Sequence, residues 1–483
     1  MRCARTLLHA MVTAIALAWV VGWAGAETAG GKPPNIVMII SDDHTYRDFG
    51  FMDNGLVKTP HLDRLAAMSA RYVSGYVTSP VCRPSLATLL TGLHTHQHRI
   101  HFNHPPPADH KIRYSMSRDE YYAARARCEV FIRAVPALPR ILARHGYDCL
   151  QTGKFWEGHH KNAGFTHGMT TGRAAGVDGC SDKQLSDGST VALGNGDIGL
   201  TIGRSTMQPL YEFIDAHDSD DDRPFFIWFA PFMPHAPHNP PQEYLDLYED
   251  DPAVPRHYVE YYASCTWFDD TVGALLAYLE KAGLTERTIF AFVADNGWTP
   301  ATQKQAGGPG YTYDRRSKRS PFEAGSRTPI LIGWKGHVQP ATHRAPCSSI
   351  DIVPTILHAV GLGDQAQGMP GINLMPSALG NRQLEQRPVF GGVYPGGASS
   401  LGNPSGHIAY RWVRDGPWKL IVPHRHGDEE VYRGYLEQVS LFDVERDPDE
   451  TTDLSGDPQY ADRLKRLRRL LDDWWTPDDQ QAE

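Results

Sequence analysis

Two pairs of oxygen-bearing side chains follow two apolar, strand-like segments of the chain. Asp42 and Asp43 follow the first segment, and Asp295 and Asn296 follow the second. For any one of these residues, a turn or a helix cap is the ordinary interpretation. Three carboxylates in one place repel each other unless a cation neutralises them, and a set made only of oxygen ligands suits Ca²⁺ or Mg²⁺ rather than Zn²⁺. Together the two pairs predict a site for a divalent metal.

One of the cysteines, Cys82, lies at the start of a helix predicted within residues 79–92. Pro84 suits the first helical turn, and Gly92 is a typical stop signal. Unpaired N–H groups at a helix start favour an anion, which predicts a lowered pKa for the Cys82 thiol. The residue types alone fit three roles for this cysteine: half of a disulfide, an inert buried thiol, or a reactive centre.

Two lysines and a histidine lie near the ends of other apolar segments. Lys154 closes the sequence Thr-Gly-Lys, Lys318 precedes Pro-Phe-Glu-Ala-Gly-Ser-Arg-Thr-Pro, and His235 and His238 belong to Pro-His-Ala-Pro-His. A solvated surface lysine and a packed histidine are the ordinary alternatives, and His238 suits the latter better. Because the net charge of the chain is −9, an anionic substrate needs a local cationic pocket, and no nucleic-acid partner is expected.

The elements that must position these residues are short apolar segments rich in Ile, Val or Phe. We predict buried parallel strands at residues 35–40, 147–152, 224–231, 288–294 and 329–334. In an open α/β sheet the ligand site lies outside the carboxyl ends of the strands. The polar residues that close these strands are therefore expected to converge.

The ends of the chain indicate further units. Residues 1–26 contain two arginines, an apolar run and Ala-Gly-Ala, which is typical of a secretory signal peptide, with a membrane anchor as the alternative. We expect an exported protein, periplasmic or secreted, without a stable membrane anchor. Of the six cysteines beyond this segment, at least one is unmatched if Cys82 is modified, so the chain is no disulfide scaffold.

Beyond about residue 380 the pattern changes to short strands, at 418–422 and 441–443, followed by an amphipathic helix over 461–475. We expect a catalytic domain over 27–380 and a C-terminal subdomain over 381–483, with a small antiparallel sheet and a terminal helix. Residues 101–139 form an insertion, which is either a candidate for substrate contacts or a surface loop with a short helix.

The motif around Cys82, Cys-x-Pro-Ser followed by a hydrophobic helix that ends in Thr-Gly, resembles the signature of the formylglycine-dependent sulfatases. These enzymes belong to the alkaline-phosphatase-like superfamily. The resemblance implies an α/β fold, with a mostly parallel central sheet flanked by helices and a smaller C-terminal α+β domain. In this family a formylglycine-generating enzyme oxidises the cysteine to 3-oxoalanine (formylglycine) during export. The family's single metal, usually Ca²⁺ with Mg²⁺ as the alternative, falls on Asp42, Asp43, Asp295 and Asn296.

The same resemblance implies a catalytic set of Cys82, Lys154, His235 and Lys318. A hydroxyl of the hydrated formylglycine would attack sulfur while both lysines neutralise the sulfuryl oxygens and His235 protonates the departing alcohol. The second hydroxyl would then expel sulfate. The run 323–327 is expected to be structural.

Two positions depart from the family pattern. Leu86 stands where the family has the arginine of Cys-x-Pro-Ser-Arg, and Trp156 stands where it has the histidine of Gly-Lys-Trp-His. Arg83 and His159 are the candidate replacements at the substrate, followed by His96 and His98. Because the metal set, both lysines and His235 are kept, we expect a divergent active enzyme rather than an inactive relative.

The sequence thus predicts a sulfatase that hydrolyses sulfate esters. Sulfated carbohydrate is the expected substrate class, because export suits polymer degradation and the site region is rich in Trp, Tyr, His and Arg. One alternative is a phosphonate or phosphate monoester hydrolase on the same scaffold, although the sequence offers no second set of His and Asp ligands. The other alternative is a catalytically inactive relative that binds sulfated glycans.

Overall fold

The computed structural model describes residues 32–172, 182–192, 198–217, 223–302, 312–424 and 436–477. The predicted signal peptide and Cys180 lie outside the described residues. None of the helices in the described ranges combines the length and the apolar character that crossing a membrane requires.

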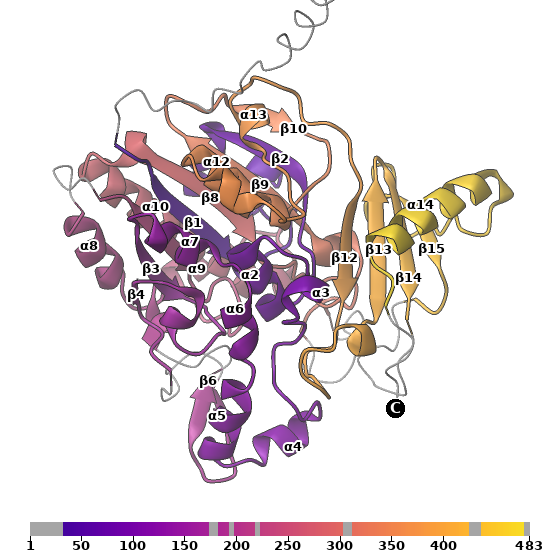
Figure 1. Ribbon diagram of the computed structural model, residues 1–483, viewed down its shortest axis with the longest axis horizontal. Coiled ribbons are helices and arrows are strands. Elements are labelled where there is room, and N and C mark those ends of the chain that lie inside the picture. Colours follow the sequence, from indigo (N-terminus) through magenta and orange to yellow (C-terminus); the bar gives the residue numbers. More distant parts are fainter. Residues whose placement is uncertain are drawn as a thin grey trace, which may run out of the picture. The chain divides into compact units, whose positions relative to one another are not determined.

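A sheet of nine strands occupies the centre of the described fold, in the order β10-β2-β9-β8-β1-β7-β3-β4, with β11 beside β2 (Figure 1). The strands are β1 (Asn35–Ser41), β2 (Ser69–Tyr76), β3 (Asp148–Gly153), β4 (His167–Gly168), β7 (Phe225–Ala230), β8 (Thr288–Ala294), β9 (Arg327–Trp334), β10 (Ala341–His343) and β11 (Cys347–Ser348). β1 pairs in parallel with β7 and β8, and β3 pairs in parallel with β7. Four of the five predicted strands are therefore confirmed as parallel strands.

The fifth predicted strand is present, but its direction was predicted wrongly. β9 runs antiparallel to both β8 and β2. It therefore begins at the edge of the sheet where β1 and β8 end. The segment before β9, which contains Lys318, is thereby brought to the same edge as the residues that follow the parallel strands.

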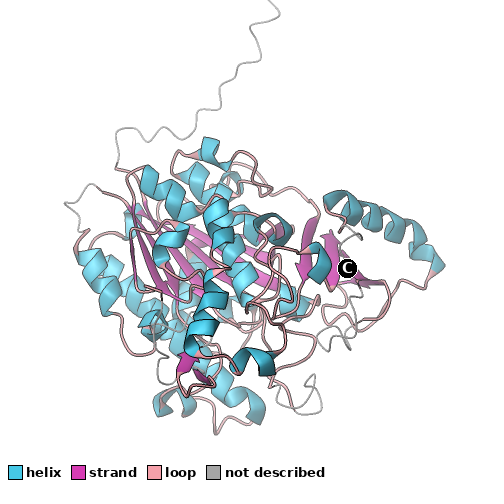
Figure 2. Cartoon of the chain, turned by 60° about the horizontal axis from the view of Figure 1, so that its bottom comes forward, coloured by secondary structure: helices cyan, strands magenta, loops and turns pink. Residues whose placement is uncertain are grey.

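Helices cover both faces of the sheet, as Figure 2 shows. One face packs against α2 (Cys82–Thr91), α7 (Leu138–Arg144), α12 (Ile352–Ala359) and α13 (Met375–Ala378), and the other against α1 (Pro60–Ala67), α8 (Gln208–Asp215) and α10 (Val259–Lys281). In β1, Met38 joins the first core and Val37 and Ile39 join the second, because successive strand side chains point to opposite faces. The predicted α/β class is confirmed.

The insertion at residues 101–139 contains more than the one short helix considered from the sequence. Its helices are α4 (His110–Tyr114), α5 (Arg118–Ala126) and α6 (Val130–Ala134). The hairpin of β5 (Asp182–Gln184) and β6 (Thr190–Ala192) lies beside α5 (Figure 1), and Leu185 packs on Tyr121 and Tyr122. Other short helices are α3 (Thr95–His98), α9 (Gln242–Leu245) and α11 (Glu323–Ser326).

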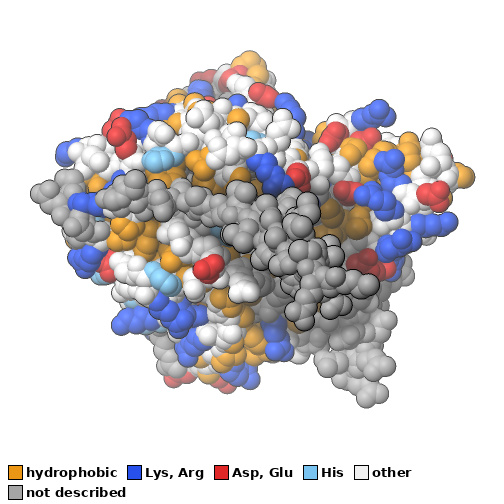
Figure 3. All heavy atoms as spheres, turned by 45° about the horizontal axis from the view of Figure 1, so that its top comes forward, with side chains coloured by type: hydrophobic (Ala, Val, Ile, Leu, Met, Phe, Trp, Pro, Cys, Tyr) orange, Lys and Arg blue, Asp and Glu red, His pale blue; other side chains and the backbone are white. Residues whose placement is uncertain are grey.

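The C-terminal part is an antiparallel sheet of four strands with one helix against it. The elements are β12 (Val389–Val393), β13 (Tyr410–Asp415), β14 (Trp418–Pro423), β15 (Ser440–Asp443) and α14 (Ala461–Trp474). Leu467 and Leu471 of α14 are fully buried against Leu420 and Leu441. The predicted terminal helix is therefore confirmed. Lys and Arg side chains gather on its outer side, at the right of Figure 3.

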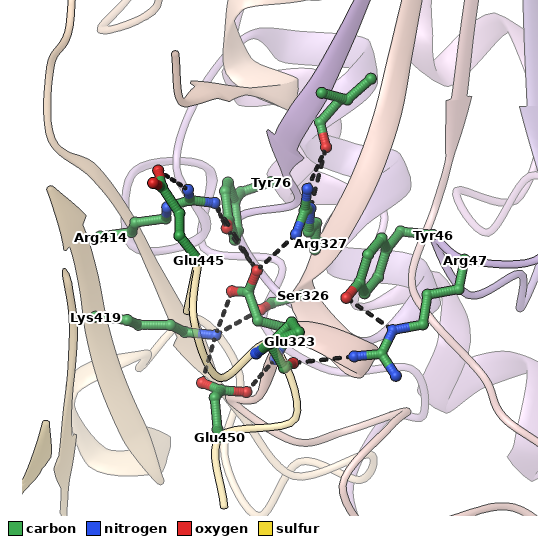
Figure 4. A network of polar contacts seen from close by, with 12 residues as sticks. Tyr46, Arg47, Tyr76, Glu323, Ser326, Arg327, Arg414, Lys419, Glu445 and Glu450 are labelled. Carbon is green, nitrogen blue, oxygen red and sulfur yellow. Dashed lines mark hydrogen bonds and ion pairs between the residues drawn. The ribbon is translucent and has the colours of Figure 1, made fainter. Parts of the chain in front are cut away.

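A buried charge network joins the C-terminal sheet to the segment before β9 (Figure 4). Lys419 of β14 lies 3.0 Å from a Glu323 oxygen and 3.2 Å from a Glu450 oxygen. The backbone N–H of Glu323 donates to Glu450 at 2.6 Å. Burial raises the pKa of Glu323, but Lys419, Arg414 and Arg327 outweigh burial and lower this pKa to about 2. This carboxylate is therefore charged and fully paired.

Candidate active site

The carboxyl ends of β1 and β8 bring the four predicted oxygen ligands together. The last residues of the two strands are paired in register, so the residues that follow them are neighbours. The backbone N–H of Asp43 donates to Oδ1 of Asp295 at 3.0 Å, and Nδ2 of Asn296 donates to Oδ1 of Asp43 at 2.7 Å. Asp42 is buried with them. Three carboxylates and one amide thus share a site shielded from water.

The free oxygen atoms of this cluster fit a hard divalent cation. Oδ2 of Asp295 and Oδ1 of Asn296 are buried without any hydrogen-bond partner, which is costly unless another group binds them. Burial raises the pKa of Asp42 to about 7, although Lys154 lowers it, and also raises the pKa of Asp295. A cation among these oxygens would favour the ionised carboxylates. The residues present therefore fit a site for Ca²⁺ or Mg²⁺.

The two predicted lysines reach the same carboxylates from two other segments. Lys154, directly after β3, donates to both Asp42 oxygens at 2.7 and 2.6 Å. Lys318, in the segment before β9, donates to Oδ2 of Asp43 at 2.5 Å. Burial lowers the pKa of both ammonium groups, but the facing aspartates outweigh burial and raise it. Both lysines are thus buried cations and not solvated surface residues.

His235, after β7, presents one ring nitrogen to the cluster. Its Nδ1 donates to the carbonyl of Ala236 at 2.6 Å, which leaves Nε2 as the nitrogen that faces Asp43 at 3.3 Å and Lys318 at 3.4 Å. Burial lowers the pKa of His235 to about 4. The histidine is therefore close enough to exchange a proton with a group bound between the lysines.

Cys82, the first residue of α2, points at the same aspartates. Its Sγ lies 3.9 Å from Oδ1 of Asp42 and 3.8 Å from Oδ1 of Asp43, and it forms no disulfide within the described residues. Burial raises the pKa of the thiol to about 12, because it outweighs the attraction of Lys154 and Lys318. The prediction of a lowered pKa is thus wrong for the unmodified thiol, since a helix start cannot replace the hydration lost by burial.

Comparison with known proteins identifies the family to which the chain belongs. A family model described as Sulfatase matches residues 34–362. This chain belongs to the sulfatase family. It is therefore a sulfuric ester hydrolase, and the four oxygen ligands, both lysines, His235 and Cys82 all lie within the matched region.

Similar sulfatases cover nearly the whole chain. Human arylsulfatase A (Homo sapiens) is 26% identical over 92% of this chain and 89% of its own length. N-acetylgalactosamine-6-sulfatase from Mus musculus is 26% identical over 96% of this chain and 90% of its own length. The solved structure of BT4656 in complex with its substrate D-glucosamine-2-N,6-O-disulfate matches with a TM-score of 0.68 at 18% identity, over 93% of this chain and all of that one. The last comparison supports the fold alone.

The candidate replacement Arg83 does not contact the oxygen cluster. Its guanidinium forms a two-bonded ion pair with Glu157, at 2.7 Å for each bond, and both side chains are 2% exposed. Its backbone N–H donates to Oδ1 of Asn103 at 2.9 Å. Arg83 thus ties the first turn of the sulfatase's α2 to the loop after β3. Glu157 was not singled out from the sequence. Its position three residues after Lys154 was the one local indication that it lies near the site.

The candidate histidines also have partners elsewhere. Nδ1 of His159 accepts the backbone N–H of Lys161 at 3.2 Å. The ring of His96 stacks on Trp475 at 4.7 Å, and Nε2 of His98 lies 3.2 Å from Oγ1 of Thr88. The described contacts therefore give none of the three a position at the sulfatase's oxygen cluster.

The two departures from the family pattern occupy apolar and aromatic surroundings. Leu86 is 3% exposed and belongs to the same core as Cys82. The ring of Trp156 lies 5.8 Å from Nζ of Lys154 and 5.7 Å from the ring of His104. Both side chains belong to the buried core that also contains Cys82. This sulfatase therefore has buried apolar side chains at two positions where the family pattern has polar ones.

Proposed function

We propose that this sulfatase hydrolyses sulfate esters of sulfated carbohydrates, with Cys82 acting after its conversion to formylglycine. The observation that carries the proposal is the position of Cys82 Sγ, within 4 Å of two buried aspartates that are themselves held by two lysines. The substrate class is supported by the relatives, since the name of one specifies N-acetylgalactosamine 6-sulfate chemistry and a structural neighbour was solved with a disulfated sugar.

The residues that would hold one divalent cation are Asp42, Asp43, Asp295 and Asn296. Ca²⁺ is the expected ion, with Mg²⁺ as the alternative, because all donors are oxygen atoms. When bound, the cation supplies positive charge that favours an anionic oxygen at the nucleophile. The unpartnered oxygens of Asp295 and Asn296 support this assignment.

The chain's own cations would bind the sulfuryl group. Lys154 and Lys318 are buried and charged on either side of the aspartates, so they can neutralise the oxygens of a transferring sulfuryl group. Because Nδ1 of His235 donates to a backbone carbonyl, Nε2 carries a proton only in the imidazolium form. The negative charge of a sulfate ester bound beside the ring would favour that form, from which Nε2 would deliver its proton to the departing sugar oxygen. Formylglycine, when present, offers a hydrated aldehyde whose second hydroxyl can release sulfate.

Maturation and organisation belong to the same proposal. The formylglycine-generating enzyme would be a partner during export, and the mature protein would be periplasmic or secreted without a stable membrane anchor. We propose the division into a signal peptide (1–26), a catalytic domain (27–380) and a C-terminal subdomain (381–483). The start of the four-stranded sheet at β12 supports the second boundary.

The decisive experiment is the mass of the Cys82 peptide from protein exported by its native host, together with sulfate release from a panel of sulfated sugars. We expect an aldehyde or its hydrate at position 82, and sulfate release that the Cys82→Ala variant lacks. Phosphate or phosphonate release without sulfate release would favour the ester hydrolase alternative. The packed Leu86 and Trp156 favour a second candidate, an inactive glycan-binding relative. An intact thiol, with glycan binding but no sulfate release, would establish it.

A further inference from the structure

Three arginines and one histidine form a second group beside the two buried lysines, and we call Arg113, Arg125, Arg319 and His104 the arginine cluster. Burial lowers the pKa of His104 well below its ordinary value, and the charges of these three arginines and of Arg83 lower it further. Four guanidinium groups therefore lie near one imidazole. Two of the arginines, in α4 and α5, come from the insertion at residues 101–139.

Within the described residues, the two arginines from the insertion carry positive charge that no neighbouring carboxylate balances. Glu157 pairs with Arg83. Arg113 donates from Nη2 to the carbonyls of Pro107 and Ala108, at 3.0 and 2.6 Å, and Arg125 donates to the carbonyl of Trp156 at 3.2 Å. In the described part of the chain, neither Arg113 nor Arg125 forms an ion pair with a carboxylate, although they are only 3% and 9% exposed.

Several polar atoms of this region also lack partners. Nδ1 of His104, Nε of Arg113 and Nε1 of Trp156 are buried without a hydrogen bond. The rings of His104 and Trp156 are 5.7 Å apart, and the guanidinium of Arg125 lies 5.5 Å from the Trp156 ring. Burying a cation without a counter-ion, or a donor without an acceptor, lowers the stability of the fold. An anion with several acceptor oxygens would satisfy both the charge and the donors.

The glycine pair Gly396–Gly397 brings two of the arginines together. A Cβ built on Gly397 would lie 2.6 Å from Nη2 of Arg113, and one on Gly396 would lie 2.9 Å from Nη2 of Arg319. The backbone N–H groups of Asn103 and His104 both donate to the carbonyl of Gly396 at 3.0 Å. Because glycines leave this space open, the two guanidinium groups can lie against the same short segment.

The cluster borders the catalytic centre on two sides. Lys154 lies 5.8 Å from the Trp156 ring, against which Arg125 also packs. Arg319 directly follows Lys318, and its backbone N–H donates at 3.0 Å to the carbonyl of Pro80, two residues before Cys82. A group bound at the cluster would therefore belong to the same substrate molecule as the ester at Cys82, or to its neighbouring sugar unit.

We propose that the arginine cluster is a second anion subsite, which binds a sulfate or carboxylate of the substrate other than the ester that is cleaved. The preferred substrates are then sugars or sugar chains that carry at least two anionic groups. This inference rests on the proposed function, because it assumes that the sugar sulfate is bound at Cys82.

The test measures binding by calorimetry at 0.15 M ionic strength (about physiological) with two probes and the Cys82→Ala protein, which needs no turnover. Sucrose octasulfate carries eight sulfate groups on a disaccharide. Tetragalacturonate is a sugar chain whose anionic groups are all carboxylates. We expect Arg113→Gln and Arg125→Gln each to weaken binding of at least one probe about tenfold, as the loss of one charge-assisted contact implies. The probe affected identifies the anion.

Two exposed arginines provide matched controls. Arg127→Gln removes a charge just after α5, and Arg469→Gln removes one from α14, and both residues are exposed. Neither control should change the affinity more than twofold. Unchanged binding in Arg113→Gln and Arg125→Gln with unaltered melting temperatures, equal losses in the controls, or no binding of either probe would overturn the subsite.

Hydrolysis of 4-nitrophenyl sulfate by the unsubstituted protein separates the two proposals. This ester carries no second anion. Failure of the proposed function appears as no hydrolysis, while arginine-dependent binding of a probe persists. Failure of the subsite appears as normal hydrolysis with binding that is insensitive to Arg113 and Arg125.

Discussion

The buried ion pair between Arg83 and Glu157 should make the stability of the fold sensitive to the loss of either partner, and the Glu157→Gln variant tests this. The two side chains form two bonds of 2.7 Å and are each 2% exposed. Opposite charges about 4 Å apart attract each other by ~4 kcal/mol at an effective dielectric constant of about 20. Removal of one partner of a buried pair costs ~3–5 kcal/mol, because the other charge is left without compensation. We expect a loss in this range.

The chain contains a matched surface pair. Arg64 and Glu280 are 2.6 Å apart, but their side chains are 56% and 59% exposed. Glu280→Gln should therefore cost far less stability than Glu157→Gln. The free energy of unfolding, measured by urea denaturation with both variants in one buffer, compares the same chemistry at two depths of burial.

The double variant Arg83→Met, Glu157→Met completes the test. Because it removes both charges of the pair, it should recover most of the stability lost in Glu157→Gln. The reasoning would be refuted if Glu157→Gln and Glu280→Gln lost the same free energy, or if the double variant were less stable than Glu157→Gln alone.

Three other perturbations probe the metal site, the terminal helix and the buried charge network. Asp295→Ala removes one of the unpartnered oxygens, so added Ca²⁺ should raise the melting temperature of the unsubstituted protein but not of the variant, and sulfate release should fall to background; an equal rise in both proteins would contradict the assignment. Leu467→Ala, at a fully buried position in α14, should cost ~2–5 kcal/mol in urea denaturation, and the half-buried Leu470→Ala should cost clearly less. The folded pKa of Glu323 is lowered to about 2, so its stabilisation is present above the ordinary value of 4.5 and is lost as pH falls from 4.5 towards 2. The stability difference between the unsubstituted protein and Glu323→Gln should therefore close over this range, and a constant difference from pH 6 to pH 3 would exclude the mechanism.

The position of the candidate site followed from local sequence patterns. Asp42 and Asp295 each follow a short apolar segment, and the ends of adjacent parallel strands meet at one edge of a sheet. Neighbouring residues also predicted that Cys82 starts a helix, which ends at Gly92. The φ of 67° at Gly92 suits a glycine. These features were predictable because each depends on residues close together in the chain.

Contacts between distant residues decided the rest. The order of the residues was enough to predict the apolar segments, the helix of Cys82 and the polar residues at the strand ends. Only the tertiary structure showed that β9 is antiparallel and that Arg83 pairs with Glu157, 74 positions away. It also showed that burial raises the Cys82 pKa. Strand direction, ion-pair partners and desolvation depend on which segments pack together, and the local pattern of residues does not carry that information.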